Sequence, residues 1–105
     1  MDAQLKKGVM DACVLSILVS GESYGYKLAQ DISTVVEMSE STLYPILRRM
    51  EQQGYLNTKN SEHNGRLRKY YSITQNGQRR LVEFKSEWAE VKRVVDYIMK
   101  EGVTS

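Results

Sequence analysis

The side chains best suited to bind a polyanion in this 105-residue chain are a group of hydroxyls followed by two arginines. They are Ser41, Thr42, Tyr44, Arg48 and Arg49. Hydroxyls near the N-terminus of a helix lie beside free backbone N–H groups, which favour phosphate, and they can reach base edges. An arginine can bridge O6 and N7 of guanine with a fork of donors. In the alternative interpretation, both arginines form ion pairs with Glu51 or Glu40 on a solvated helix face.

A second group of candidates lies in residues 59–80, where basic residues are concentrated. The stretch holds six basic residues and one acid, Glu62, so it carries +5 in a chain whose net charge is +2. Such a segment is typical of a polyanion-binding protein. In a strand, alternation places Arg66 and Arg68 on one face and Lys69 on the other. There they would bind phosphates or the minor groove, unless the segment is basic only for solubility.

The composition limits other chemistry. One histidine and one cysteine cannot supply the three or four ligands of a zinc site. The glycine-rich motifs of nucleotide-binding proteins are absent. His63 lies in Glu62-His63-Asn64-Gly65, a typical turn, which is a poor place for a catalytic histidine that a buried partner must orient. We therefore expect no enzymatic activity, no metal and no cofactor.

The cysteine count and the hydropathy bear on location. Cys13 is the only cysteine, so no disulfide can form within the chain, which suits a reducing cytosol. The longest apolar run, residues 12–19, is interrupted by Ser16 and is far shorter than the ~20 residues of a membrane span. No basic-then-apolar signal opens the chain. We expect a cytoplasmic protein that does not contact a membrane.

The pattern of apolar and turn residues predicts four helices and two strands. The helices are expected at about 5–19, 24–35, 40–53 and 77–100, and the strands at 55–60 and 67–73. Ser23 is the expected N-cap of the second helix. Pro45 must lie near the first turn of the third helix or kink it, because proline lacks a backbone N–H. The Asn64-Gly65 pair predicts a tight hairpin.

The first and last helices both indicate a partner subunit. The first is apolar in almost every direction, so one small domain cannot easily cover it. The last carries apolar residues at alternating spacings of three and four, a heptad pattern. They are Leu81, Phe84, Trp88, Val91, Val95 and Ile98. A helix of that length, roughly 36 Å, must extend beyond a domain whose radius of gyration is ~11 Å. We expect a homodimer held by these residues.

The order of elements defines the fold class. We expect a mainly α protein with a small β-hairpin: a winged helix-turn-helix domain at residues 1–73 and a long C-terminal dimerisation helix at residues 74–105. The second and third helices have the layout of a helix-turn-helix, and the hairpin is its wing. Such a unit places the polar face of its second helix in a major groove of double-stranded DNA.

Three stretches of the chain resemble the PadR family of bacterial transcriptional regulators. They are Ser-Tyr-Gly-Tyr-Lys-Leu at residues 23–28, Ser-Thr-Leu-Tyr-Pro-Ile-Leu-Arg-Arg-Met-Glu-Gln-Gln-Gly-Tyr-Leu at residues 41–56, and Gly-Arg-Leu-Arg-Lys-Tyr-Tyr-Ser-Ile-Thr at residues 65–74. Leu67 departs from the family pattern, in which proline or arginine is more usual. The resemblance implies a dimer that represses an inverted-repeat operator and is often released by a small molecule. It adds Tyr24, Lys27 and Pro45 to the residues expected at DNA.

The single terminal helix resembles the short subgroup of the family, which includes multidrug-sensing members. In those, paired tryptophans on the last helix hold flat aromatic compounds at the dimer interface. The ligand-binding residues that this resemblance implies are Trp88, Phe84, Leu15, Ala12 and Asp11. Lys85 and Lys92 replace residues that are not basic in those members, so the ligand preference does not transfer.

Two other functions remain open on the sequence alone. A winged-helix module that binds only proteins is expected to carry acids on its third helix and a neutral wing, unlike Arg48, Arg49 and the basic stretch. A sequence-tolerant architectural DNA binder is the other alternative, and binding to unrelated DNA at two salt concentrations would distinguish it.

Overall fold

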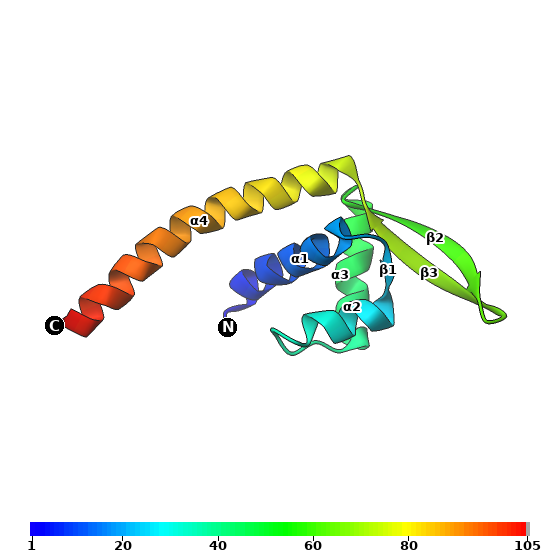
Figure 1. Cartoon of the computed structure of the whole chain (residues 1–105), viewed down its shortest axis with the longest axis horizontal. Helices are drawn as coiled ribbons and strands as arrows, with labels where there is room; N and C mark the ends of the chain where they lie inside the picture. The colour runs from blue at the N-terminus through cyan, green and yellow to red at the C-terminus, as the bar shows by residue number, and fades with distance from the viewer. Residues whose placement is uncertain (105) are drawn as a thin grey trace.

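The computed structural model describes the backbone of residues 1–104 and the side chains of residues 1–100. Figure 1 shows the helical domain beneath the start of the long C-terminal helix, which extends to the left, while the β-hairpin wing projects to the right. In chain order the elements are α1 (Ala3–Val19), β1 (Ser23–Tyr24), α2 (Gly25–Ile32), α3 (Glu40–Gln52), β2 (Leu56–His63), β3 (Arg66–Ile73) and α4 (Gln75–Thr104). The expected winged helix-turn-helix with a long C-terminal helix is confirmed.

The core lies among α1, α2, α3 and the base of the sheet. Helix α1 contributes four buried apolar side chains, and it packs against α2, α3, β3 and α4. The other buried side chains come mainly from the apolar stripes of α2 and α3. Much of the cover that α1 needs therefore comes from its own chain, including α4, whereas its all-round apolar pattern suggested a partner subunit for the second side. One strip of α1, described below, remains accessible.

The sheet has three strands and not the two that were expected. The short β1 pairs antiparallel with β3, with Ser23 opposite Tyr71 and Tyr24 opposite Tyr70. Ser23 is consequently buried and does not cap α2, whose N-cap position is occupied by Tyr24. The prediction of Ser23 as an N-cap was therefore wrong. A two-residue strand is too short to produce a hydropathy period, and its partner lies almost fifty residues away.

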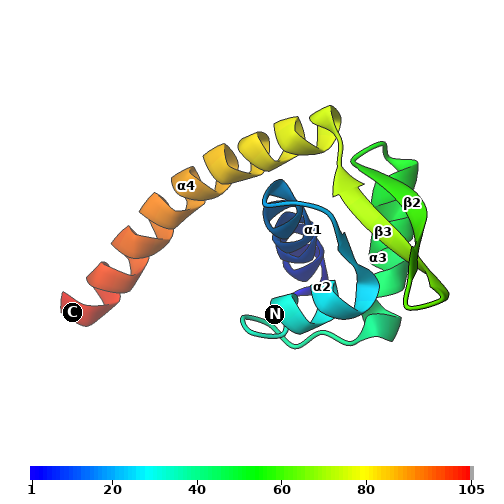
Figure 2. The same cartoon turned by 45° about the vertical axis from the view of Figure 1, so that its right-hand side comes forward.

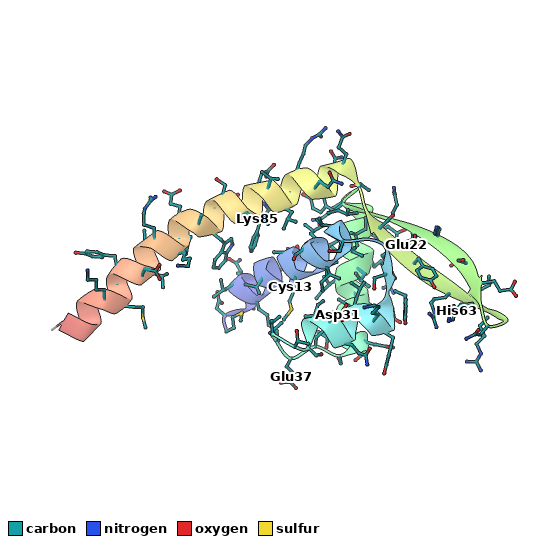
Figure 3. The ribbon with its side chains drawn as sticks, viewed as in Figure 1. Cys13, Glu22, Asp31, Glu37, His63 and Lys85 are labelled. Carbon is teal, nitrogen blue, oxygen red and sulfur yellow. The ribbon has the colours of Figure 1, made fainter. Side chains whose placement is uncertain are left out.

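The wing consists of β2 and β3, which are joined by a two-residue turn. His63 pairs with Arg66, and both Asn64 and Gly65 have positive φ, at 52° and 78°. Two consecutive left-handed residues form the type I′ turn that matches the twist of a hairpin. The strand β2 extends to His63, three residues beyond the expected end, so His63 lies near the tip of the wing (Figure 3).

Helix α3 begins and ends close to the expected residues. Ser39 is its N-cap, and the Ser39 Oγ accepts a hydrogen bond from the Thr42 backbone N–H at 3.2 Å. Pro45 lies inside the helix, in its second turn. Because proline has no N–H, the Ser41 carbonyl loses its usual donor four residues on. The helix continues through this position, with Leu43, Leu47 and Met50 fully buried on its inner face.

Helix α4 starts two residues before its expected N-terminus. The Thr74 Oγ1 accepts a hydrogen bond from the Gly77 backbone N–H at 3.0 Å, which closes the first turn. The helix then leaves the domain as an arm, and the molecule measures 62 × 26 × 22 Å (Figure 2). Every side chain from Val91 to Lys100 is exposed. Leu81, by contrast, is only 5% exposed and packs in the core of its own domain.

Gly77 joins the wing to the arm, and we expect its replacement to destabilise the fold. A Cβ at this position would lie 2.4 Å from the Tyr55 carbonyl oxygen and 2.7 Å from Ile73 Cγ1. The carbonyl cannot move freely, so Gly77→Ala should cost about 1–3 kcal/mol, the usual effect of overpacking. Gly8→Ala is the matched control, because its nearest neighbour would be Phe84 at 3.6 Å. This second change should stabilise α1 by roughly 0.5–1 kcal/mol. Urea unfolding at one protein concentration measures both, and equal midpoints would contradict the argument.

Candidate nucleic-acid interface

The outer face of α3 presents the polar side chains that the sequence analysis selected. Those exposed on this face are Ser41, Thr42, Tyr44, Pro45 and Arg48. At the N-terminus of the helix the hydroxyls of Ser39, Ser41 and Thr42 form a cluster. The Ser39 Oγ lies 3.1 Å from the Ser41 Oγ and donates a hydrogen bond to the Thr42 Oγ1 at 2.9 Å. The helix therefore offers hydroxyls at one end and an arginine two turns later, on the face that points away from the core.

A concave surface separates α3 from the wing. It is lined by Tyr24, Gly25, Tyr26, Tyr44, Leu67, Arg68, Lys69 and Tyr71, and its volume is about 480 Å³. One wall comes from the start of α2 and α3 and the other from β3. Tyr44 packs directly on Gly25, because a Cβ at that position would lie only 2.7 Å from the tyrosine oxygen. A surface of this shape, with aromatic rings and cations on facing walls, can receive a nucleic-acid backbone.

Arg68, in the outer half of the wing, is held by an aromatic pair. Its guanidinium carbon lies 4.0 Å from the centre of the Tyr24 ring. Tyr24 in turn meets Tyr70 edge to face, with ring centres 5.7 Å apart. The pairing of β1 with β3 places both rings side by side. A cation over an aromatic face is attracted by the ring quadrupole and keeps its N–H donors free at the edge. Arg68 is therefore held on an aromatic ring and, among the described side chains, is not neutralised by a carboxylate.

The cations of the basic stretch differ in whether a carboxylate accompanies them. Lys59 pairs with Glu22 at 3.2 Å, Lys69 with Glu51 at 3.8 Å, and Arg80 with two glutamates of α4. Within the residues whose side chains the structure describes, Arg66 and Arg68 form no ion pair. Exposed pairs of this kind contribute little stability and can exchange their acid for a phosphate. Lys27, on α2, is likewise paired with Asp31, at 3.3 Å.

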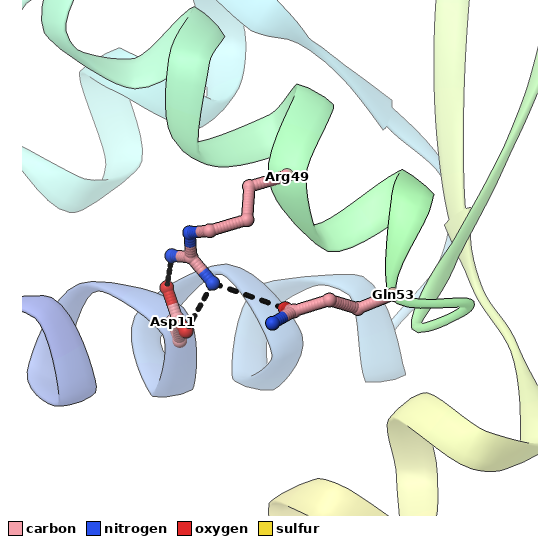
Figure 4. A network of polar contacts seen from close by, with 3 residues as sticks. All are labelled: Asp11, Arg49 and Gln53. Atoms are coloured by element: carbon pink, nitrogen blue, oxygen red, sulfur yellow. Dashed lines mark hydrogen bonds and ion pairs between the residues drawn. The ribbon is translucent and has the colours of Figure 1, made fainter.

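Arg48 and Arg49 have different environments. Among the described side chains, Arg48 is exposed and has no carboxylate partner, so the expected alternative of a pair with Glu40 or Glu51 does not occur. Arg49 points the other way and forms a two-pronged pair with Asp11 of α1, with N–O distances of 2.5 and 3.1 Å (Figure 4). Its Nη1 also donates to Gln53 at 3.0 Å. We therefore remove Arg49 from the residues expected to contact DNA.

A second hollow lies between α1 and α4 and is mainly apolar. Its lining residues are Val9, Ala12, Cys13, Ser16, Leu81, Phe84, Lys85 and Trp88, and its volume is about 320 Å³. Phe84 and Trp88 stack on one another with ring centres 5.4 Å apart and an angle of 21° between planes. Burial raises the pKa of the Cys13 thiol, which favours its neutral form. Figure 3 shows Cys13 on α1 and Lys85 on the arm above it.

Only some of the expected ligand-binding residues line this apolar groove. Trp88, Phe84 and Ala12 do, but Leu15 is 1% exposed and belongs to the core. Asp11 lies on another side of α1, where it binds Arg49. Within one protomer, Leu15 and Asp11 therefore do not line the groove that Phe84 and Trp88 form. The position of each residue on α1 determines whether its side chain faces the groove, because neighbouring residues on a helix point in directions about 100° apart.

Comparison with known proteins places these features in a family. The sequence model of the "Transcriptional regulator PadR-like family" matches residues 14–83, two thirds of the chain. The chain belongs to the PadR-like family. The matched region runs from the middle of α1 through the wing to the start of the arm. The resemblance inferred from the three sequence stretches is thus confirmed.

Solved PadR-like structures share both the domain and the arm. A PadR-like transcriptional regulator of Bacillus cereus is 34% identical, with a TM-score of 0.83, over 92% of this chain and 97% of that one. A PadR family regulator of Clostridium difficile is 31% identical, with a TM-score of 0.80, over 86% and 97%. An uncharacterised protein of Lysinibacillus sphaericus is 33% identical over 90% of this chain and 91% of its own. These alignments cover nearly whole chains.

Membership of the PadR-like family makes this chain a transcriptional regulator, of a family that binds DNA and is not enzymatic.

Across the residues that the structure describes, no helix has both the length and the apolar character needed to cross a membrane.

Several residues of this surface were missed at the sequence level. Tyr26 and Tyr71 line the concave surface, and Tyr70 supports Tyr24. The wing strand carries Tyr70 and Tyr71 in adjacent positions, so alternation alone could have assigned one of them to each face. Their proximity to Tyr24, in contrast, depends on the pairing of β1 with β3, which no local pattern reveals.

Proposed function

We propose that this PadR-family regulator is a homodimeric repressor that binds an inverted-repeat operator. In each protomer α3 enters a major groove and presents Ser41, Thr42, Tyr44, Pro45 and Arg48. The wing contacts the backbone or the minor groove through Arg66, Arg68 and Lys69, and Tyr24 and Lys27 bind phosphates at the start of α2. The observation that carries the proposal is that Arg68 lines the concave surface beside α3, while Arg48 is exposed on α3 one turn after Tyr44, which lines the same surface. Neither arginine has a carboxylate partner in the described structure.

The dimer would form through the arm. Beyond Trp88, α4 exposes large apolar side chains around more than half of its surface: Val91, Val94, Val95, Tyr97, Ile98 and Met99. A helix with so wide an apolar face needs a partner, and a second copy supplies a self-complementary one. Residues 1–73 then act as the DNA-binding unit and residues 74–105 as the dimerisation unit, in the cytoplasm with the DNA.

Selection from a random DNA library tests this function. Protein is mixed with duplexes that carry a random central segment, and bound duplexes are amplified and sequenced. We expect enrichment of an inverted repeat whose half-sites are about one helical turn apart, roughly 10 bp, or a multiple of that. Enrichment of no sequence, with tight binding to unrelated DNA that falls steeply with salt, would indicate an architectural DNA binder. Absence of DNA binding at low salt would indicate a protein-binding module.

Repression is proposed to be released by a planar aromatic compound that binds near Trp88. Two arms that meet at a dimer axis would bring two copies of Trp88 and Phe84 close together, and facing aromatic rings can stack on a flat ligand. Ala12 lines the same groove. Lys85 also lines it and would favour an anionic compound over a cationic one. Release requires that the ligand prefer a dimer geometry in which the two α3 helices do not fit the operator.

Titration of Trp88 fluorescence tests the ligand proposal, because Trp88 is the only tryptophan. A panel of flat cationic dyes and phenolic acids is added to the protein, with and without the selected operator. We expect at least one compound to quench Trp88 and to weaken operator binding by about 1–3 kcal/mol, the usual size of such coupling. Quenching without a change in operator affinity would mean a pocket that is not a switch. If no compound quenches Trp88, its role is packing at the interface.

A further inference from the structure

The pair formed by Asp11 and Arg49 is the polar contact between α1 and the recognition helix α3. Both oxygens of Asp11 accept from Arg49, at 2.5 and 3.1 Å, and Gln53 accepts from the same guanidinium at 3.0 Å (Figure 4). The side chains of Arg49 and Asp11 are only 28% and 22% exposed, less than those of any other ion pair in the described structure. A two-pronged pair of planar groups fixes distance and orientation together, which apolar packing does not do as strictly.

The place of this pair in the fold gives it a consequence for DNA recognition. Arg49 follows directly after Arg48, which faces outward from α3. Helix α1 also packs against the arm α4, with Phe84 3.6 Å from the point where a Cβ on Gly8 would lie. The arm sets how two protomers face each other, whereas α3 must meet the DNA. One chain of contacts from the arm to α3 therefore runs through α1 and the Asp11–Arg49 pair.

We propose that Asp11 and Arg49 are positioning residues for DNA recognition. The pair locks α3 against α1, so that Arg48 and the hydroxyls of α3 have a fixed place relative to the dimer arm. Neither residue touches DNA. This inference rests on the proposed function, in which α3 enters the major groove of an operator.

The sign of the effect of Asp11→Asn separates positioning from direct DNA contact. If Arg49 contacted DNA, the loss of an acid beside it would leave operator affinity unchanged or raise it, because a negative charge near a polyanion is unfavourable. If Asp11 positions α3, the same change weakens operator binding. We expect a loss of roughly three- to thirtyfold, the range found for residues that act through a neighbour.

The experiment measures binding of the full-length protein to the duplex that the wild type enriches from the random library. The variants are Asp11→Asn, Arg49→Lys and the two combined, each checked for its oligomeric state and its thermal unfolding. Arg49→Lys keeps the charge but loses the fork, so it should weaken binding as Asp11→Asn does. The double variant should be no weaker than either single variant, since all three lack the same contact. The slope of log affinity against log salt concentration should stay at the wild-type value in these variants, because no phosphate contact is lost.

Asp96→Asn is the matched control, because Asp96 pairs with Lys92 at 2.8 Å within a single helix and joins no two elements. It should bind as the wild type does. Should Asp11→Asn fail to fold, Arg49→Lys decides through its affinity, and Arg49→Gln, which removes the charge, decides through its salt slope. The inference is overturned if either single variant binds as tightly as the wild type, or if Arg49→Gln lowers the salt slope by about one unit, as the loss of a phosphate contact would. A wild type that enriches no duplex refutes the proposed function instead, so the two failures are distinguishable.

Discussion

A chain that carries both Val91→Asp and Val95→Asp is expected to sediment as a folded monomer, whereas the wild type sediments as a dimer. The two side chains are 43% and 44% exposed in the protomer, and they lie one turn apart on the arm. Because they contribute nothing to the core of their own domain, the substitutions should leave the fold of residues 1–73 intact. In the dimer each would bury a carboxylate without a partner, at a cost of several kcal/mol.

The control for this result places the same charge on the opposite face of the arm. Ser86 and Ala89 are both exposed, and at 100° per residue they lie across the helix from Val91 and Val95. Ser86→Asp with Ala89→Asp therefore adds two acids to α4 without touching the apolar face. That variant should remain a dimer by sedimentation. A dimer that survives Val91→Asp with Val95→Asp would refute the arm as the interface.

Loss of the dimer should also change DNA binding in a defined way. A monomer covers one half-site and loses the second set of contacts that the dimer makes in the same binding event. We expect the monomeric variant to bind a single half-site and the full inverted repeat with almost equal affinity per site. The control variant should retain its preference for the full repeat.

The sequence predicted the elements whose signals are long and local. The apolar stripe of α3, with Ser39 before it, gave the position of the recognition helix to within a residue or two. The Asn64-Gly65 pair gave the turn of the wing, because only a few residue types accept two positive φ values in succession. The overhang of α4 followed from its expected length, since a helix over residues 77–100, roughly 36 Å long, must extend beyond a domain of the remaining residues.

What the sequence did not predict depends on contacts between distant segments. The charge of Arg49 suggested DNA, but its direction depends on Asp11, which lies 38 residues earlier in the chain. Arg48 and Arg49 are alike in type and adjacent in sequence. Only the rotation of about 100° between adjacent residues of a helix makes one point outward and the other inward. Leu81 fitted the heptad pattern equally well, yet α4 begins against the core and becomes free only later. The periodicity of apolar residues identifies the apolar face of a helix, but it does not show which element packs against that face.

Arg48 and Arg68 are expected to contribute to operator binding in two different ways. Arg48 extends from the outer face of α3, so Arg48→Ala should remove a contact to a base edge and cost about 1–3 kcal/mol at each half-site. Because a dimer presents two copies, the loss on the full repeat should be about twice that on one half-site. The effect should be specific to sequence: affinity for unrelated DNA should change little.

Arg68→Ala should weaken binding to all DNA sequences alike. Its guanidinium rests on the Tyr24 ring, where it would meet a phosphate. Removal of one phosphate contact lowers the slope of log affinity against log salt by about 0.9 for each protomer. Tyr24→Leu should reproduce part of this loss by freeing Arg68 from its aromatic support, whereas Tyr24→Phe, which keeps the ring, should preserve that support.

Arg93→Ala is the control for both arginines, because Arg93 is exposed on the arm and far along the chain from α3 and the wing. Operator affinity and salt slope should stay at their wild-type values in this variant. Titrations on the selected operator and on unrelated DNA, each at two salt concentrations, separate the effects. Equal loss on both DNAs for Arg48→Ala would mean that Arg48 binds the backbone. An unchanged salt slope for Arg68→Ala would mean that the wing does not reach a phosphate, and recognition would then rest on α3 alone.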